Sequence, residues 1–206
     1  MEDSYQMSRT YSILSASIFN RFGHGPDRVQ IDVEFPDGAG TNASFIIELS
    51  PIDEMPHSIF LFLKQVDRGL WNEKGFHLNT PSILQATPES VDAVIAQEAL
   101  NANGYTSFEE AGLAALSFVE HHDSLPRDEW AVAFASKGPE FYINKVDNIG
   151  DGTCFGVIRE GRDAVKKMYD LPTEDQEKGF KLKKPVRILK ATILAIQDTD
   201  LSFCTA

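Results

Sequence analysis

The sequence predicts a mainly β domain, either a barrel or a sandwich, with capping helices. Seven or eight short segments have the alternation or the apolar run of β-strands, whereas only two or three have helical spacing. The two kinds of segment do not alternate regularly, which argues against a parallel sheet built from β–α–β units. With 206 residues, the chain is long enough to bury the core of one large domain.

The first predicted elements of this domain form a β-hairpin and a helix. Residues 29–35 alternate apolar and polar side chains, as a half-buried strand does, and residues 45–49 form the returning strand after a turn. A helix is predicted from Pro56, because proline is tolerated at a helix start and apolar residues then recur at helical spacing. Gly69 ends this helix.

The middle of the chain predicts one or two short strands at residues 75–87, followed by an Ala/Glu-rich stretch at 89–122. This stretch favours helix, with breaks at Gly104 and Gly112. Three strand candidates follow, at residues 130–135, 140–144 and 153–159.

The remaining elements are a helix, a loop and a long final strand. Residues 160–171 place apolar side chains on one helical face. Residues 174–184 predict a charged loop, and residues 185–196 alternate as a long last strand.

The N-terminal residues 1–27 predict an arm or short helix, because Leu14, Ile18 and Phe22 lie four residues apart. An arm that docks a partner is the alternative. Acidic residues stand where a signal peptide would carry basic ones, which gives an expectation of a cytoplasmic protein. No apolar run approaches the roughly 18 residues that a membrane span needs.

Composition excludes several classes of function. Acidic residues outnumber basic ones 31 to 19, giving a net charge of −12, which argues against nucleic-acid binding. Two cysteines exclude a disulfide-dense scaffold and a four-cysteine zinc site. No cofactor or metal is predicted, and the run from Glu120 to Asp123 is interpreted as a solvated helix end. A basic cluster is formed by Lys178, Lys181, Lys183, Lys184, Arg187 and Lys190. Most of its members fall in the predicted loop, which is interpreted as solvated, with a patch for an acidic partner as the alternative.

Several short motifs follow one another in an informative order. Asp53–Ser58 leads into the first helix, and Gly75-Phe76-His77 and then Gln85 come after it. Later come Glu140–Ile143, and Cys154–Val157 with Glu160-Gly161 and a helix. In this order the chain resembles the cyclophilin-type peptidyl-prolyl cis-trans isomerases over residues 28–196. The resemblance implies a closed eight-stranded antiparallel barrel capped by two helices. It leaves a divergent, helical insertion at 88–127 within a domain of residues 28–197, and a C-terminal tail at 198–206.

Members of this family bind X-Pro peptides in a groove and accelerate rotation about the prolyl amide, which is otherwise slow. The resemblance implies an apolar pocket for the proline ring and an arginine that favours the twisted amide. Here Leu78 falls at the arginine position, so no catalytic residue is assigned, and Gly152-Thr-Cys154 lacks the pocket histidine. The residues that the resemblance places in the peptide-binding groove are Phe76, Ile83, Gln85, Ala135, Ser136, Phe141 and Tyr142.

These residues lead to a hypothesis of a cyclophilin-fold protein with weak or absent isomerase activity that acts as a module for binding or scaffolding proteins or peptides. The alternative is an active isomerase that assists protein folding, in which Lys137 or Lys145 supplies the missing cation. The expected partner is a protein or a proline-containing peptide. A third hypothesis is a subunit of a larger assembly with a filled groove.

Overall fold

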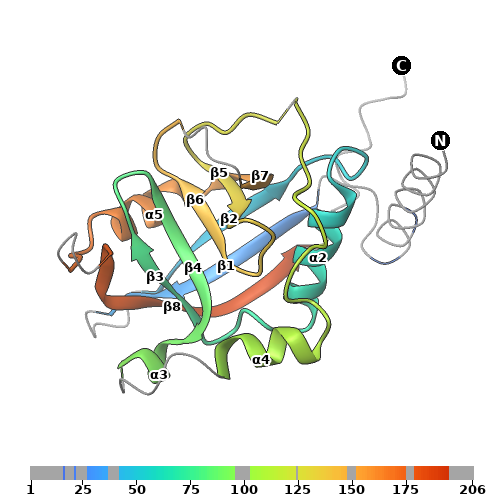
Figure 1. Cartoon of the computed structure of the whole chain (residues 1–206). Coiled ribbons are helices and arrows are strands. Elements are labelled where there is room, and N and C mark those ends of the chain that lie inside the picture. Colours follow the sequence, from blue (N-terminus) through green and yellow to red (C-terminus); the bar gives the residue numbers. More distant parts are fainter. Residues whose placement is uncertain are drawn as a thin grey trace.

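Eight antiparallel strands close into one barrel in the part of the chain that the structure describes (Figure 1). This computed structural model describes residues 16, 21, 27–36, 42–95, 103–123, 125–147, 152–174 and 179–194. Around the barrel the strands run in the order β1-β2-β7-β5-β6-β4-β3-β8, and every neighbouring pair is antiparallel. The predicted closed eight-stranded antiparallel barrel is therefore confirmed.

The strands lie close to the ranges that the sequence predicts. They are β1 (Arg28–Glu34), β2 (Asn42–Leu49), β3 (Lys74–Asn79), β4 (Ile83–Ser90), β5 (Ala131–Phe134), β6 (Phe141–Asn144), β7 (Thr153–Glu160) and β8 (Lys181–Leu194). In β1 the alternation has its expected cause, because Val29, Ile31 and Val33 are fully buried while the residues between them are half-buried.

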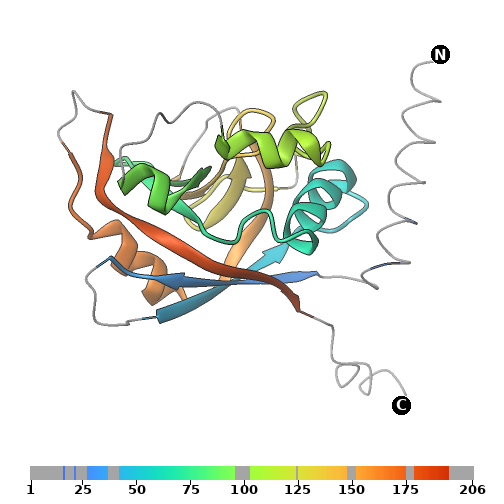
Figure 2. The same ribbon diagram turned by 90° about the horizontal axis from the view of Figure 1, so that it is seen from below.

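Two of the described helices lie at opposite ends of the barrel, α2 (Pro56–Asp67) and α5 (Arg162–Tyr169), as both views show (Figures 1 and 2). Helix α2 begins with Pro56 at its first turn, as predicted, and its buried face packs on the barrel core. Two further helices, α3 (Val91–Ile95) and α4 (Asn103–Glu110), come from the segment that favours helix.

The structure corrects two of the predicted elements. Residues 111–123 are not helical, because Gly112 leaves the helix with a positive φ of 67° and Leu116 then bonds the carbonyl of Lys137. Residues 181–184 are not a loop but the start of β8. Their charged side chains are compatible with a strand because the hydrogen bonds of a β-sheet use only the backbone. Of the N-terminal arm, Arg21 forms an ion pair of 2.6 Å with Asp67; most of the arm and the whole C-terminal tail lie outside the described residues.

Aromatic rings fill the barrel core. Phe62 of α2 lies 4.8 Å from the ring centroid of Phe155, and Phe155 lies 4.5 Å from Phe134. Trp71 packs edge-on against Phe141 at 4.7 Å. This dense core fixes the inner face of the strands, so that any binding surface on the barrel must use the outer face.

Candidate functional site

One row of side chains crosses the outer face of six neighbouring strands. The ladder places Lys181 of β8 opposite Leu78 of β3, and Leu78 opposite Gln85 of β4. Gln85 in turn faces Tyr142 of β6. The row then continues through Ala133 of β5 to Cys154 of β7. Directly opposed residues of an antiparallel pair share a face, with Cβ atoms about 5 Å apart. These six residues are called the outer row below.

The centre of the outer row belongs to an apolar cluster that is separate from the barrel core. Its buried members are Ala131, Ala133, Tyr142 and Cys154, and Ile83 and Ala135 pack against them. Ala133 is fully buried and the other three are at most 7% exposed, so this cluster is a second, smaller packed core on the outer side of the sheet.

Of the seven residues predicted to line a groove, the structure brings Ile83, Ala135 and Tyr142 together in this outer cluster. Gln85 stands beside them in the outer row and is half-buried. Ser136 follows Ala135 as an exposed residue with a positive φ of 58°.

The other two predicted groove residues, Phe76 and Phe141, lie inside the barrel. Both side chains are fully buried in the main core, and their rings meet edge-to-face with centroids 5.8 Å apart. Successive strand residues point to opposite faces, so Phe141 is directed inward where Tyr142 is directed outward. Both rings therefore lie in the main core on the inner side of the sheet, and not on the outer face with Tyr142.

The tyrosine ring of the outer cluster is almost closed off from solvent. Tyr142 is only 7% exposed, and its hydroxyl lies against Gly152 at the start of β7. A Cβ added at Gly152 would overlap that hydroxyl and would come within 2.9 Å of the Phe134 carbonyl oxygen. The hydroxyl therefore occupies room that a larger residue at 152, or a ligand, would need.

The two lysines proposed at first as substitute cations are hydrogen-bonded elsewhere. The Lys137 ammonium donates to the carbonyl of Ser117 at 3.0 Å. The Lys145 ammonium donates to Asn79 Oδ1 at 3.0 Å and to the Thr80 carbonyl at 2.9 Å. Lys181, which the sequence analysis placed in a loop, is the exposed lysine that the ladder sets directly opposite Leu78.

His77, beside Leu78, is a neutral structural residue. Its ring is 8% exposed, and Nε2 lies 3.3 Å from the Glu89 carbonyl oxygen. Burial lowers the pKa of His77 to about 4, so that the ring carries no charge at neutral pH. His77 therefore supplies no cation in place of the missing arginine.

Sequence reasoning missed Ala131, Ala133 and Cys154 as members of the outer face. Alternate residues of a strand share a face, so Ala131 and Ala133 could have been identified from Ala135. Cys154 could not, because the pairing of β5 with β7 shifts by one residue between Val132 and Ala133. Among the described residues, no group of three or more His, Cys, Asp or Glu side chains converges on a common metal position. No described helix is long and apolar enough to cross a membrane.

Comparison with known proteins gives structural matches only. No family model matches the sequence, and no curated protein matches it. The model matches a cyclophilin type peptidyl-prolyl cis-trans isomerase of Cryptosporidium parvum with a TM-score of 0.60 at 17% identity, covering 83% of this chain and 99% of that one. A second crystal structure of that protein, in the presence of the dipeptide Ala-Pro, matches with a TM-score of 0.59 at 18% identity. The match covers 82% of this chain and 99% of that one.

The chain has the cyclophilin fold. The architecture supports this conclusion without any appeal to sequence identity. The eight-stranded barrel with α2 and α5 is the arrangement that the family resemblance implies.

Proposed function

We propose that this cyclophilin-fold protein binds protein or peptide segments on its outer row and has little or no prolyl isomerase activity. The observation that carries the proposal is Leu78, which stands next to Gln85 in the outer row where the family resemblance implies an arginine. A leucine side chain neither donates a hydrogen bond nor carries charge, so it cannot favour the twisted prolyl amide.

The expected size of this loss supports weak or absent activity. Removing one donor that stabilises a transition state typically costs about 10² to 10³ in rate, or roughly 3–4 kcal/mol. Tyr142, one of the residues that the family resemblance places in the groove, carries a hydroxyl that lies against Gly152. Binding without turnover needs contacts with a peptide but no group that favours the transition state.

A second candidate function is a slow but genuine isomerase with Lys181 as the cation. The observation that favours it is the pairing of this exposed lysine with Leu78, which sets an ammonium group on the same face of the sheet. An ammonium is a point charge without the planar fork of a guanidinium, so it would replace an arginine only in part.

A protease-coupled assay on a proline peptide separates the two candidates. We expect turnover of the wild-type protein at the uncatalysed rate, and a gain of about 10² or more in the Leu78→Arg variant, further increased by Tyr142→Phe. Wild-type turnover that falls in Lys181→Ala, but not in the matched control Lys183→Ala, would establish the slow isomerase instead. Wild-type turnover comparable to an active cyclophilin, unaffected by either lysine, would contradict both.

Peptide binding is tested separately from turnover. One structural neighbour was solved in the presence of Ala-Pro, which supports a proline-containing ligand for the same face here. We expect Ala-Pro titrated into ¹⁵N-labelled protein to shift the backbone amides of Gln85, Ala133 and Tyr142, and shifts confined to other faces of the barrel would contradict the proposal. Sizing the native protein tests the further proposal that it belongs to a larger assembly.

A further inference from the structure

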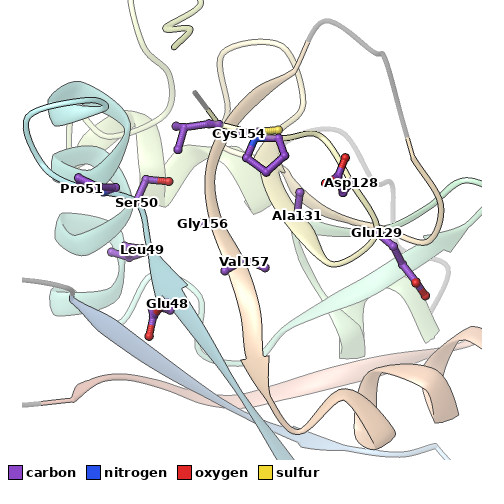
Figure 3. Close-up of a pocket in the computed structure, with 12 residues that line it drawn as sticks. Glu48, Leu49, Ser50, Pro51, Asp128, Glu129, Ala131, Cys154, Gly156 and Val157 are labelled. Carbon is purple, nitrogen blue, oxygen red and sulfur yellow. The ribbon is translucent and has the colours of Figure 1, made fainter. Parts of the chain in front are cut away.

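A pocket of about 300 Å³ lies beside the outer row, over β7 and the end of β2. Figure 3 shows Leu49 and Pro51 on one side of β7, and Asp128 and Glu129 on the other. Ala131 and Cys154 form part of its lining and are also members of the outer cluster. The pocket thus adjoins the outer cluster at β5 and β7, whereas Leu78, Gln85 and Tyr142 of the outer row do not line it.

The wall of this pocket consists mainly of small and medium-sized apolar side chains. Leucine, proline, alanine, valine and cysteine side chains make up most of the twelve lining residues, and the two prolines, Pro51 and Pro126, restrict the backbone there. Its volume is at the lower limit of pockets that hold drug-sized ligands. A single large apolar side chain fits this space better than an extended small molecule.

The lining of the pocket includes acidic residues and no basic one, although Arg28, Arg127 and Arg159 lie beside it. Three lining residues are acidic, Glu48, Asp128 and Glu129, and none of the twelve is Lys, Arg or His. The Glu48 carboxylate is already neutralised, since it accepts hydrogen bonds from Arg28 at 2.8 Å and from Arg159 at 2.5 Å. Asp128 and Glu129 are exposed, and no described residue forms an ion pair with either of them.

We propose that this pocket docks a segment of another protein that inserts one leucine or phenylalanine and carries lysine or arginine next to it. The apolar wall gains free energy by burying the side chain. The Asp128 and Glu129 carboxylates attract the flanking cations, and a chain of net charge −12 strengthens that attraction at long range. The site is independent of prolyl isomerisation, because Leu78 and Gln85 do not line it.

Two fluorescein-labelled probe peptides test this proposal by fluorescence anisotropy: Lys-Arg-Leu-Phe-Arg-Lys and its acidic counterpart Glu-Asp-Leu-Phe-Asp-Glu. We expect the basic peptide to bind and the acidic one to bind at least about tenfold more weakly. The double variant Asp128→Lys/Glu129→Lys is expected to weaken the basic peptide about tenfold and to reduce the salt dependence of its binding. The matched control Glu109→Lys/Glu110→Lys makes the same change of net charge on exposed residues of α4, and we expect it to change the affinity less than twofold.

Amide shifts in ¹⁵N-labelled protein locate the bound peptide. Shifts at Cys154, Gly156 and Val157 support the pocket, whereas shifts confined to Gln85 and Tyr142 would overturn it and would leave the proposed peptide groove intact. Equal binding of both peptides, or of neither at millimolar concentration, would also overturn it. So would a concentration-dependent dimer that the Asp128→Lys/Glu129→Lys variant abolishes, because the occupant would then be a second copy of the chain.

Discussion

Glu120 Oε2 accepts two hydrogen bonds from Ser58, one from the backbone N–H at 2.7 Å and one from the hydroxyl at 2.6 Å. Oε1 of the same carboxylate accepts a third, from the His57 N–H at 3.1 Å. Glu120 is 2% exposed and lies in the irregular segment after α4, and its carboxylate accepts hydrogen bonds from N–H groups in the first turn of α2. The run from Glu120 to Asp123 is thus not a solvated helix end: its first residue is an N-terminal cap supplied from 62 residues away.

The Glu120→Gln variant should lower the free energy of unfolding by about 1 to 3 kcal/mol, because an amide accepts at one atom only and carries no charge for the helix dipole. Urea denaturation measures the change, with the exposed Glu109→Gln as the matched control. Burial lowers the pKa of His57, and the Glu120 charge opposes this, so the variant should lower that pKa further. Equal stability of the two variants would contradict the cap.

The sequence predicts well where one face of a strand is buried and the other is not. Val29, Ile31 and Val33 alternate with polar residues and all point inward. Strand β6 offers no such contrast, because all four of its residues are buried, and this is why Phe141 and Tyr142 could not be assigned to faces from sequence.

Irregular pairing explains most of what else the sequence could not predict. The ladder shifts between Phe76 and Leu78, so counting alternate residues from Phe76 assigns Leu78 to the wrong face. The outer row itself joins residues of six strands, and only the order of strands around the barrel brings them together. The path of residues 111–123 likewise depends on tertiary bonds, such as the buried Gln65 amide donating to the Leu113 carbonyl at 2.8 Å.

The glycine that begins α5 is required by both its backbone conformation and its packing. Gly161 has a φ of 74°, and an added Cβ would lie 2.6 Å from the Phe45 Cα. We expect Gly161→Ala to cost about 3 kcal/mol or more, since a backbone clash adds to the left-handed strain. Gly179→Ala is the matched control: its φ is 77°, but no described residue has an atom within 4 Å of an added Cβ, so a loss of only about 1 kcal/mol is expected. If urea denaturation gave the same loss of unfolding free energy for both variants, the left-handed backbone strain alone would explain it and the clash at Gly161 would contribute nothing.

Asp27, at the start of β1, should make the protein less stable as the pH rises from about 4 to 6. Burial raises its pKa from 3.8 to about 6, and its buried Oδ2 has no hydrogen-bond partner among the described residues. The folded state therefore holds a proton that the unfolded state releases above pH 3.8, and the penalty is complete above pH 6.

The Asp27→Asn variant mimics the protonated acid. Its free energy of unfolding, relative to that of the wild type, should therefore be about 1 to 2 kcal/mol higher at pH 7 than at pH 4. Urea denaturation at both pH values measures this, with the exposed Asp53→Asn as the control. A wild-type stability that rises across this interval, with no difference between the two variants, would contradict a buried ionised carboxylate at position 27.

Cys154, the thiol shared by the outer cluster and the pocket, should react slowly. Burial raises its pKa above the ordinary value, and the Arg127 charge opposes this only in part, so little thiolate is present at pH 8. In a Cys204→Ser variant, we expect alkylation by iodoacetamide at pH 8 to be at least about tenfold slower than in the same protein unfolded in urea. The pH at which the rate is half of its maximum should be higher in the folded than in the unfolded protein, which poor access alone would not produce. The basic probe peptide should slow the reaction further while the acidic peptide leaves it unchanged. A rate equal to that of the unfolded chain would show that Cys154 is open to solvent and that the pocket wall is not formed as described.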